Sequence, residues 1–144
     1  MPSRHPHSDE PYCPWRILVA DNDLARQLAW TLTHHGATAV AIATSGEEAL
    51  AHAAGAKFDL ILLNYRMPRK NGAVTLRELR ARGDVTPVIM ISAWSRDEIP
   101  DPIDDLAFDD WIEKPFSSHH LLTRINHSID RHRAAAGAAD GDTT

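Results

Sequence analysis

The sequence predicts a three-layer α/β domain in which helices cover both faces of a five-stranded parallel sheet. Five short apolar runs alternate with helical patterns along the chain, at the intervals typical of βαβ units with right-handed crossovers. The third and fourth runs are apolar without alternation, which is expected of strands that are buried on both faces. We predict strands at residues 16–20, 38–43, 58–63, 88–91 and 110–112.

Four segments between and after these strands have helical patterns. Leucines recur every four residues before Gly36, which is a typical helix stop. Ser45 and Glu48 have the spacing of a capping box at the start of the second helix. The four predicted helices are marked by Leu24, Leu28 and Leu32; by Ala49, Leu50 and Ala53; by Val74, Leu76 and Leu79; and by Leu122, Ile125 and Ile129.

The segment between the fourth and fifth strands fits a helix poorly. Pro100 and Pro102 each remove a helical hydrogen bond, so a continuous helix cannot pass through them. We predict a short helix with Asp101 as N-cap and Pro102 at its first position, ending near Phe108. The residues before it are expected to form a loop or a single 3₁₀ turn.

Length and composition favour one domain. The 144 residues carry a net charge of −5, which argues against a nucleic-acid-binding surface. The apolar runs are too short to span a membrane, and residues 1–14 lack the apolar segment of a signal peptide, so we expect neither feature. The single cysteine, Cys13, excludes an internal disulfide. We expect a cytoplasmic domain at residues 15–134 between flexible tails at 1–14 and 135–144, and we expect no output domain after the second tail.

Polar residues follow the predicted strands at their carboxyl ends, where an open parallel sheet binds its ligands. Asp21 and Asn22 follow the first strand, and Asn64 and Arg66 follow the third. Ser92 follows the fourth strand and Lys114 the fifth. These groups are therefore expected to converge on one crevice.

Four segments, ILVADND, DLILLNYRMPRKNG, PVIMISA and DWIEKPF, stand in an order and at a spacing that resemble bacterial two-component response regulator receiver domains. The resemblance covers residues 15–134. It implies a flavodoxin-like (βα)5 fold with strand order 2-1-3-4-5, a place in phosphorelay signalling and no enzymatic role.

In that family, an aspartate at the end of the third strand accepts a phosphoryl group from a phosphohistidine. The resemblance further implies a Mg²⁺ pocket of acidic residues after the first strand, and a hydroxyl, a lysine and an aromatic residue that respond to phosphorylation. Asp21 matches the pocket, and Ser92, Trp111 and Lys114 match the responding positions. The chain departs from the pattern at two positions: Asn64 stands at the acceptor and Asn22 at the second acidic position.

These two departures have a chemical consequence. The carboxamide of Asn64 is neutral and cannot form the acyl phosphate that a carboxylate nucleophile forms. Mg²⁺ prefers anionic oxygens, and Asp21 is the one carboxylate left at the matched positions, since Asp23 is expected to point away. We therefore expect no metal site, weak or absent Mg²⁺ binding, and a vestigial pocket of Asp21, Asn22 and Arg66.

The resulting hypothesis is a stand-alone atypical receiver, a pseudo-receiver, that works by phosphorylation-independent protein–protein contact. The partner would be a histidine kinase, another regulator or an output protein. One alternative is a conventional phosphorelay receiver in which Asn64 is an introduced change. Another is a flavodoxin-like domain that binds a small ligand, although no glycine-rich loop follows the first strand. Purely structural roles are a further alternative for three features: the pair of Lys114 with Asp21, the Ser92 hydroxyl and the Trp111 side chain.

Charge is unevenly distributed along the chain. Residues 97–113 carry acidic side chains without a basic one, and Arg124, Arg131 and Arg133 make the last helix basic. We expect these two regions to form a contact surface, and a homodimer through residues 97–113 and 117–133 would place acidic rows against basic ones. The adjacent histidine pairs cannot chelate a metal together on a helix.

Overall fold

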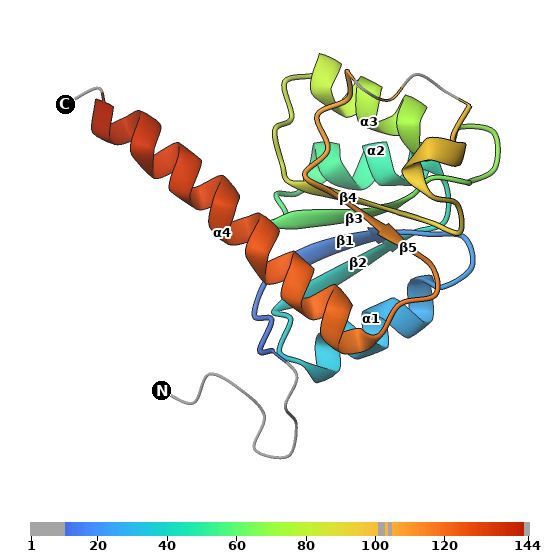
Figure 1. Cartoon of the computed structure of the whole chain (residues 1–144), viewed down its shortest axis with the longest axis horizontal. Coiled ribbons are helices and arrows are strands. Elements are labelled where there is room, and N and C mark those ends of the chain that lie inside the picture. Colours follow the sequence, from blue (N-terminus) through green and yellow to red (C-terminus); the bar gives the residue numbers. More distant parts are fainter. Residues whose placement is uncertain (1–10, 101–102, 104, 143–144) are drawn as a thin grey trace.

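The computed structural model describes residues 11–100, 103 and 105–142, and it confirms the predicted α/β fold. Five parallel strands form one sheet in the order β2-β1-β3-β4-β5. Helices α1 and α4 cover one face, and α2 and α3 cover the other (Figure 1). The strands are β1 (Arg16–Ala20), β2 (Ala39–Ala43), β3 (Leu60–Asn64), β4 (Val88–Ser92) and β5 (Asp110–Glu113); the helices are α1 (Ala25–His34), α2 (Gly46–Gly55), α3 (Gly72–Ala81), the 3₁₀ turn η1 (Arg96–Glu98) and α4 (Ser118–Asp142).

The core has two halves separated by the sheet. Every residue of β3 and β4 is buried, as their unbroken apolar runs predict. Successive side chains of β3 alternate between the halves: Leu60 and Leu62 pack on the α1 and α4 side, and Ile61 and Leu63 on the α2 and α3 side. Each such side chain contributes about 1.5–3 kcal/mol by burial, so β3 and β4 anchor the sheet whose ends carry the crevice.

The helix ends largely follow the predicted signals. Gly36 has φ 107 directly after the α1 cap, a left-handed conformation that favours glycine. Ser45 Oγ accepts a hydrogen bond from the Glu48 N–H at 3.1 Å. The Glu48 carboxylate reaches back to the N–H of Thr44 at 2.8 Å, one residue before the position that a capping box uses.

The short helix predicted over 102–108 is wrong for the residues that the structure describes in that stretch. Residues 103 and 105–108 are not helical, and residues 101, 102 and 104 lie outside the described part. A single turn remains, in which the N–H of Leu106 donates to the Ile103 carbonyl at 3.0 Å. The predicted 3₁₀ turn before it is confirmed as η1.

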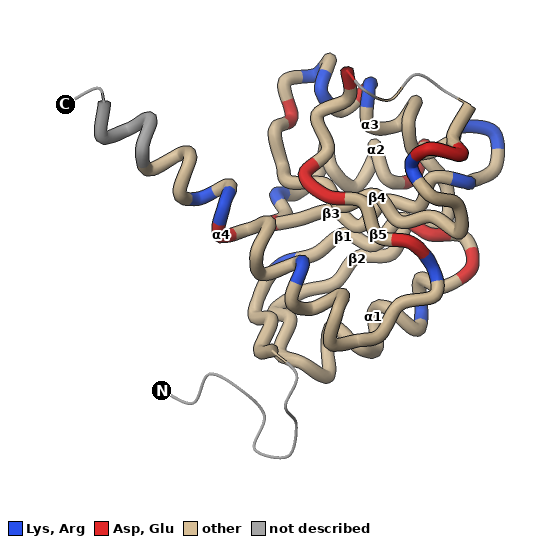
Figure 2. The backbone as a smooth tube through the Cα atoms, in the orientation of Figure 1, with Lys and Arg blue, Asp and Glu red and all other residues tan. Residues whose placement is uncertain are grey.

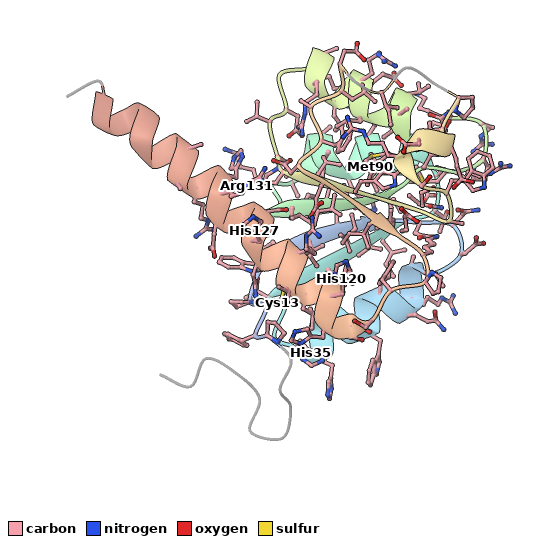
Figure 3. The ribbon with its side chains drawn as sticks, in the orientation of Figure 1. Cys13, His35, Met90, His120, His127 and Arg131 are labelled. Carbon is pink, nitrogen blue, oxygen red and sulfur yellow. The ribbon has the colours of Figure 1, made fainter. Side chains whose placement is uncertain are left out.

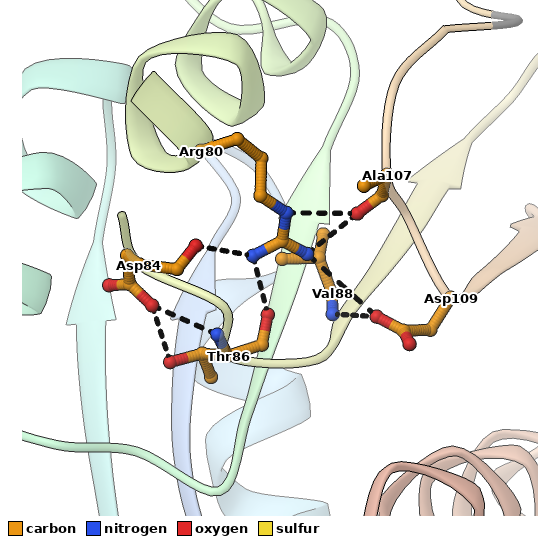
Figure 4. A network of polar contacts seen from close by, with 6 residues as sticks. All are labelled: Arg80, Asp84, Thr86, Val88, Ala107 and Asp109. Carbon is orange, nitrogen blue, oxygen red and sulfur yellow. Dashed lines mark hydrogen bonds and ion pairs between the residues drawn. The ribbon is translucent and has the colours of Figure 1, made fainter. Parts of the chain in front are cut away.

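Arg80 explains why the end of this connection is extended (Figure 4). Its guanidinium donates to the Ala107 carbonyl at 3.0 and 2.6 Å, and to the carbonyls of Asp84 and Thr86 at 2.8 and 2.9 Å. The Asp109 carboxylate lies 3.9 Å from the guanidinium. It also accepts a hydrogen bond from the Val88 N–H at 2.7 Å. A helix here would remove the Ala107 carbonyl from this network, so a long-range contact overrides the local capping signal.

Both predicted domain boundaries differ from the structure. Residues 1–10 lie outside the described part, but Cys13, predicted to be in a flexible tail, is fully buried, and its N–H donates to the His35 carbonyl at 2.8 Å (Figure 3). At the other end α4 continues through Asp142, so most of the predicted tail is helical (Figure 1). The alanines after Arg133 are strong helix formers and extend α4 without a stop.

Over the described residues, none of the helices combines the length and the apolar character that crossing a membrane requires.

Candidate functional site

The carboxyl ends of four neighbouring strands bring the predicted polar residues together. Asp21 follows β1, Asn64 ends β3, Ser92 ends β4 and Lys114 follows β5. Because β1, β3, β4 and β5 are adjacent and parallel, their last residues lie at one edge of the sheet. The strand ends therefore place Asp21, Asn64, Ser92 and Lys114 at this edge.

Asp21 is buried, with an ion pair on one carboxylate oxygen and two hydrogen bonds on the other. One carboxylate oxygen, Oδ2, lies 3.0 Å from Lys114 Nζ. The other accepts hydrogen bonds from the N–H groups of Asp23 at 2.8 Å and Leu24 at 3.0 Å. Lys114 thereby compensates a charge that burial would otherwise make costly.

Asn64 is buried with its amide nitrogen toward two acceptors. Its Nδ2 donates to Asn22 Oδ1 at 3.1 Å and to the Arg66 carbonyl at 2.7 Å. A carboxylate has no hydrogen to donate and would bring negative oxygens against both acceptors. The amide group therefore fits these surroundings, and it ties the end of β3 to the loop that follows β1.

Gly72 and Asn71, which the sequence analysis did not assign to the site, let α3 begin directly against Asn64. The Gly72 N–H donates to the Tyr65 carbonyl at 2.6 Å, and a Cβ at Gly72 would lie 2.5 Å from the Asn64 carbonyl oxygen. Asn71 caps the helix by accepting from the Val74 N–H at 2.9 Å. The Asn71-Gly72 pair, a cap residue followed by the smallest residue, was the available signal.

Ser92 and Trp111, on different strands, both hold the backbone of Trp94. Ser92 Oγ accepts from the Trp94 N–H at 2.9 Å, and the Trp111 Nε1–H donates to the Trp94 carbonyl at 3.2 Å. The ring of Tyr65 lies 6.3 Å from the Trp94 ring and 6.4 Å from the Trp111 ring, centroid to centroid. The aromatic side chains at the mouth of the crevice thus form one connected cluster.

A cavity of about 460 Å³ opens beside this cluster. The guanidinium of Arg66 stacks over the Trp94 ring, 4.9 Å from its centroid. Asp23 is exposed and does not line the cavity; it lies in the bend after β1 and not in the strand, so strand alternation does not set its direction. The cavity is lined by Asn22, Tyr65, Arg66, Met67, Pro68, Asn71, Trp94 and Pro100.

The donor atoms of the crevice do not match a Mg²⁺ ion. Mg²⁺ requires near-octahedral coordination by hard oxygens, usually with one or two carboxylates. The carboxylate of Asp21 already binds Lys114 and two backbone N–H groups, and Asn64 presents its amide nitrogen to Asn22. Among the described residues, no group of three or more acidic, histidine or cysteine side chains could hold a metal ion.

The acidic residues 97–113 and the basic last helix, α4, contact each other within one chain. Arg124 of α4 contacts the Asp110 carboxylate. A second residue of residues 97–113, Asp105, lies 3.3 Å from Arg77 of α3. Acidic and basic positions are interspersed over the domain (Figure 2). The expectation that Arg124 is available for a carboxylate of a second chain therefore needs correction, because it already has a partner.

The strand order and the crevice at the ends of β1, β3, β4 and β5 define a receiver domain. The chain belongs to the response regulator receiver domain family, whose model matches residues 17–126. It is 34% identical over 131 residues to the response regulator MprA of Mycolicibacterium vanbaalenii, a match that covers 88% of this chain and 55% of the relative. It is also 36% identical over 116 residues to the uncharacterized transcriptional regulatory protein YkoG of Bacillus subtilis, covering 78% and 50% of the two chains.

Solved structures agree with this assignment. The receiver domain of a Francisella response regulator is 30% identical and superimposes with a TM-score of 0.73, covering 82% of this chain and 98% of the other. The chemotaxis protein CheY4 of Vibrio cholerae is 26% identical with a TM-score of 0.73, covering 78% and 97%. The chain spans about half the length of the curated relatives it matches.

Proposed function

We propose that this receiver domain signals by protein–protein contact without phosphoryl transfer, as a pseudo-receiver. The observation that carries the proposal is the amide of Asn64 at the acceptor position, bonded to Asn22 and to the Arg66 carbonyl. A carboxamide nitrogen has a delocalised lone pair and its oxygen has no full charge, so neither atom attacks a phosphohistidine. In this proposed function, the crevice residues have no catalytic role.

Mg²⁺ is not part of this proposed mechanism. In a conventional receiver the ion offsets the negative charge of acidic residues and of the phosphoryl group. Here Lys114 already neutralises Asp21, and the two asparagines add no charge. We therefore propose that Mg²⁺ binding is weak or absent.

Ser92 and Trp111, which match the positions that respond to phosphorylation, support a single arrangement of the crevice backbone. Ser92 Oγ accepts from the Trp94 N–H and the Trp111 Nε1–H donates to the Trp94 carbonyl, so both side chains fix the Trp94 backbone in this arrangement. A receiver held in one arrangement can serve as a constant binding partner for a histidine kinase, another regulator or an output protein. These three classes are the proposed partners.

A homodimer through residues 97–113 and 117–133 stays a prediction. Arg124 contacts Asp110 and Arg133 lies 3.2 Å from Asp59, so two of the three expected arginines already have a partner within the chain, while Arg131 remains exposed on α4. Sedimentation at low and high salt tests it, and a monomer at high micromolar concentration in both conditions would exclude this dimer.

The alternative of an introduced change at Asn64 must also account for Asn22. Its oxygen accepts a hydrogen bond from the Asn64 nitrogen, so the two asparagines form a matched pair. A single introduced change would leave this complementarity to chance. The residue encoded at position 64 in the natural gene decides between the two accounts.

Mass spectrometry after incubation with Mg²⁺ and acetyl phosphate tests the proposal. We expect no phosphoryl adduct on the unaltered chain, because Asn64 cannot form an acyl phosphate. The matched control is the double variant Asn22→Asp with Asn64→Asp, in which both carboxylates are restored. A stoichiometric adduct on the unaltered chain would contradict the proposal, whatever residue carries it.

A further inference from the structure

The cavity beside Asn22 has an unusual charge for a crevice of this fold. Arg66 is the single charged residue among the described residues that line it. Asp21, just beneath, is neutralised by Lys114 at 3.0 Å. Asn22 and Asn64 contribute no charge, so the local balance is positive where three carboxylates would make it negative.

Two hydrogen-bond donors of this cavity are available. Among the described residues, the Arg66 guanidinium makes no hydrogen bond or ion pair, and it stacks over the Trp94 ring, 4.9 Å from its centroid. Asn22 uses its oxygen to accept from Asn64, which leaves its amide N–H groups to donate. A stacked guanidinium is held in place while its N–H edge stays accessible, and this edge matches a carboxylate or a phosphate.

Apart from the amide of Asn71, the rest of the lining is apolar or aromatic. Trp94, Met67, Pro68 and Pro100 form walls around the space, and the volume of about 460 Å³ lies within the range typical of small-molecule sites. An occupant that fits these walls has an apolar or aromatic body. Combined with the donors, the lining favours an anion with such a body over a bare ion.

We propose that this cavity binds a small organic anion, with its carboxylate or phosphate group on Arg66 and Asn22 and its apolar body against Trp94. The inference rests on the proposed function, because carboxylates at positions 22 and 64 would repel the ligand. Asn64 is a positioning residue: its Nδ2–H holds the Arg66 carbonyl at 2.7 Å. Since Ser92 and Trp111 hold the Trp94 backbone, an occupant would act on the same cluster that a phosphoryl group would otherwise address.

Titration of the full chain with phenyl phosphate and with benzoate, without Mg²⁺, tests the site. Binding is measured by calorimetry and by the indole N–H signal of Trp94, assigned through its loss in Trp94→Phe. Both anions share the proposed chemistry, and the comparison shows which head group is preferred. Phenol, which has the ring without the charge, and inorganic phosphate, which has the charge without the ring, are expected to bind at least tenfold more weakly than the better anion.

Arg66→Gln is expected to weaken binding about tenfold or more, because it removes the charged partner of the anion. The matched control is Arg69→Gln, three residues further along the same loop, exposed and outside the cavity lining. We expect it to change the affinity less than twofold. Asn64→Asp is expected to weaken binding as well, through repulsion and loss of the hold on Arg66.

Absence of heat and of a Trp94 shift at millimolar anion would overturn the anion site, as would equal losses in the Arg66 and Arg69 variants. Neither result affects the proposed function, because phosphorylation is measured separately as a mass increase with acetyl phosphate. A mass increase with normal anion binding would instead contradict the proposed function and leave the site in place.

Discussion

The amide nitrogen of Asn64 lies 3.1 Å from the side-chain oxygen of Asn22, and this hydrogen bond joins the end of the central strand β3 to the loop that follows the neighbouring strand β1. Two neutral amides attract each other at this distance, whereas two carboxylates would repel unless a cation lay between them. The pair therefore holds the crevice together without a metal ion.

The double variant Asn22→Asp with Asn64→Asp is expected to lower the free energy of unfolding by about 1–3 kcal/mol in the presence of EDTA. Added Mg²⁺ should recover much of this loss, because the variant supplies the carboxylates that the ion prefers. Urea unfolding with EDTA and with millimolar Mg²⁺ measures both effects. Unchanged stability in EDTA would show that the amide pair contributes little.

Arg80→Met is expected to destabilise the fold by about 2–3 kcal/mol, because it leaves the carbonyls of Ala107, Asp84 and Thr86 without their donor. Burial lowers the pKa of Arg80, but Asp109 and Asp84 oppose this shift. Arg77→Met is the matched control on the same helix. Its pair with Asp105 is exposed and should contribute less than about 1 kcal/mol. Equal losses in urea unfolding would contradict the role given to Arg80.

Gly72→Ala is expected to cost about 1–3 kcal/mol, since its Cβ would meet the Asn64 carbonyl oxygen and force α3 away from β3. Gly55→Ala is the control, because nothing lies near a Cβ added there. Thermal unfolding of both variants separates a steric effect from a general effect of replacing glycine. A Gly72 variant as stable as the Gly55 variant would refute the close approach.

Cys13 is expected to resist alkylation in the folded chain at pH 8, because burial raises the pKa of its thiol to about 12. Since the folded pKa lies above the ordinary value of 9.0, burying the neutral thiol stabilises the fold below pH 9. That contribution is lost as the pH rises from 9 toward 12. Thiol labelling before and after denaturation measures the protection, and rapid labelling of the folded chain would contradict it.

The sequence predicts the fold well where one local pattern decides the structure. The unbroken apolar runs of β3 and β4 and the glycine after α1 have the structures their patterns indicate. The predicted secondary structure is wrong where a contact between distant parts of the chain determines the backbone conformation. Arg80 is far in sequence from Ala107, yet its hydrogen bonds hold the β4–β5 connection extended, and capping signals cannot reveal such a contact.

The candidate site shows the same division. The strand order places the four polar strand ends at one edge of the sheet. Other features depend on how side chains from different elements pack together. These are the direction of the Asn64 amide, the hydrogen bonds of Ser92 and Trp111 to the Trp94 backbone, and the contact of Arg124 with Asp110. Sequence spacing identifies which residues meet, but it leaves open which atoms face each other.

The most direct test of the central claim is a nitrogen-15 correlation spectrum of the full chain, recorded before and after addition of Mg²⁺ with acetyl phosphate. The Trp111 indole N–H, bonded to the Trp94 carbonyl, is the signal that would follow any phosphorylation-driven rearrangement of the crevice. A domain that works without phosphoryl transfer predicts no phosphoryl adduct, and signals of Trp111, Asn22 and Asn64 that are back at their original positions once the acetyl phosphate has been removed by rapid desalting. A shifted Trp111 signal accompanied by a phosphoryl adduct would contradict it.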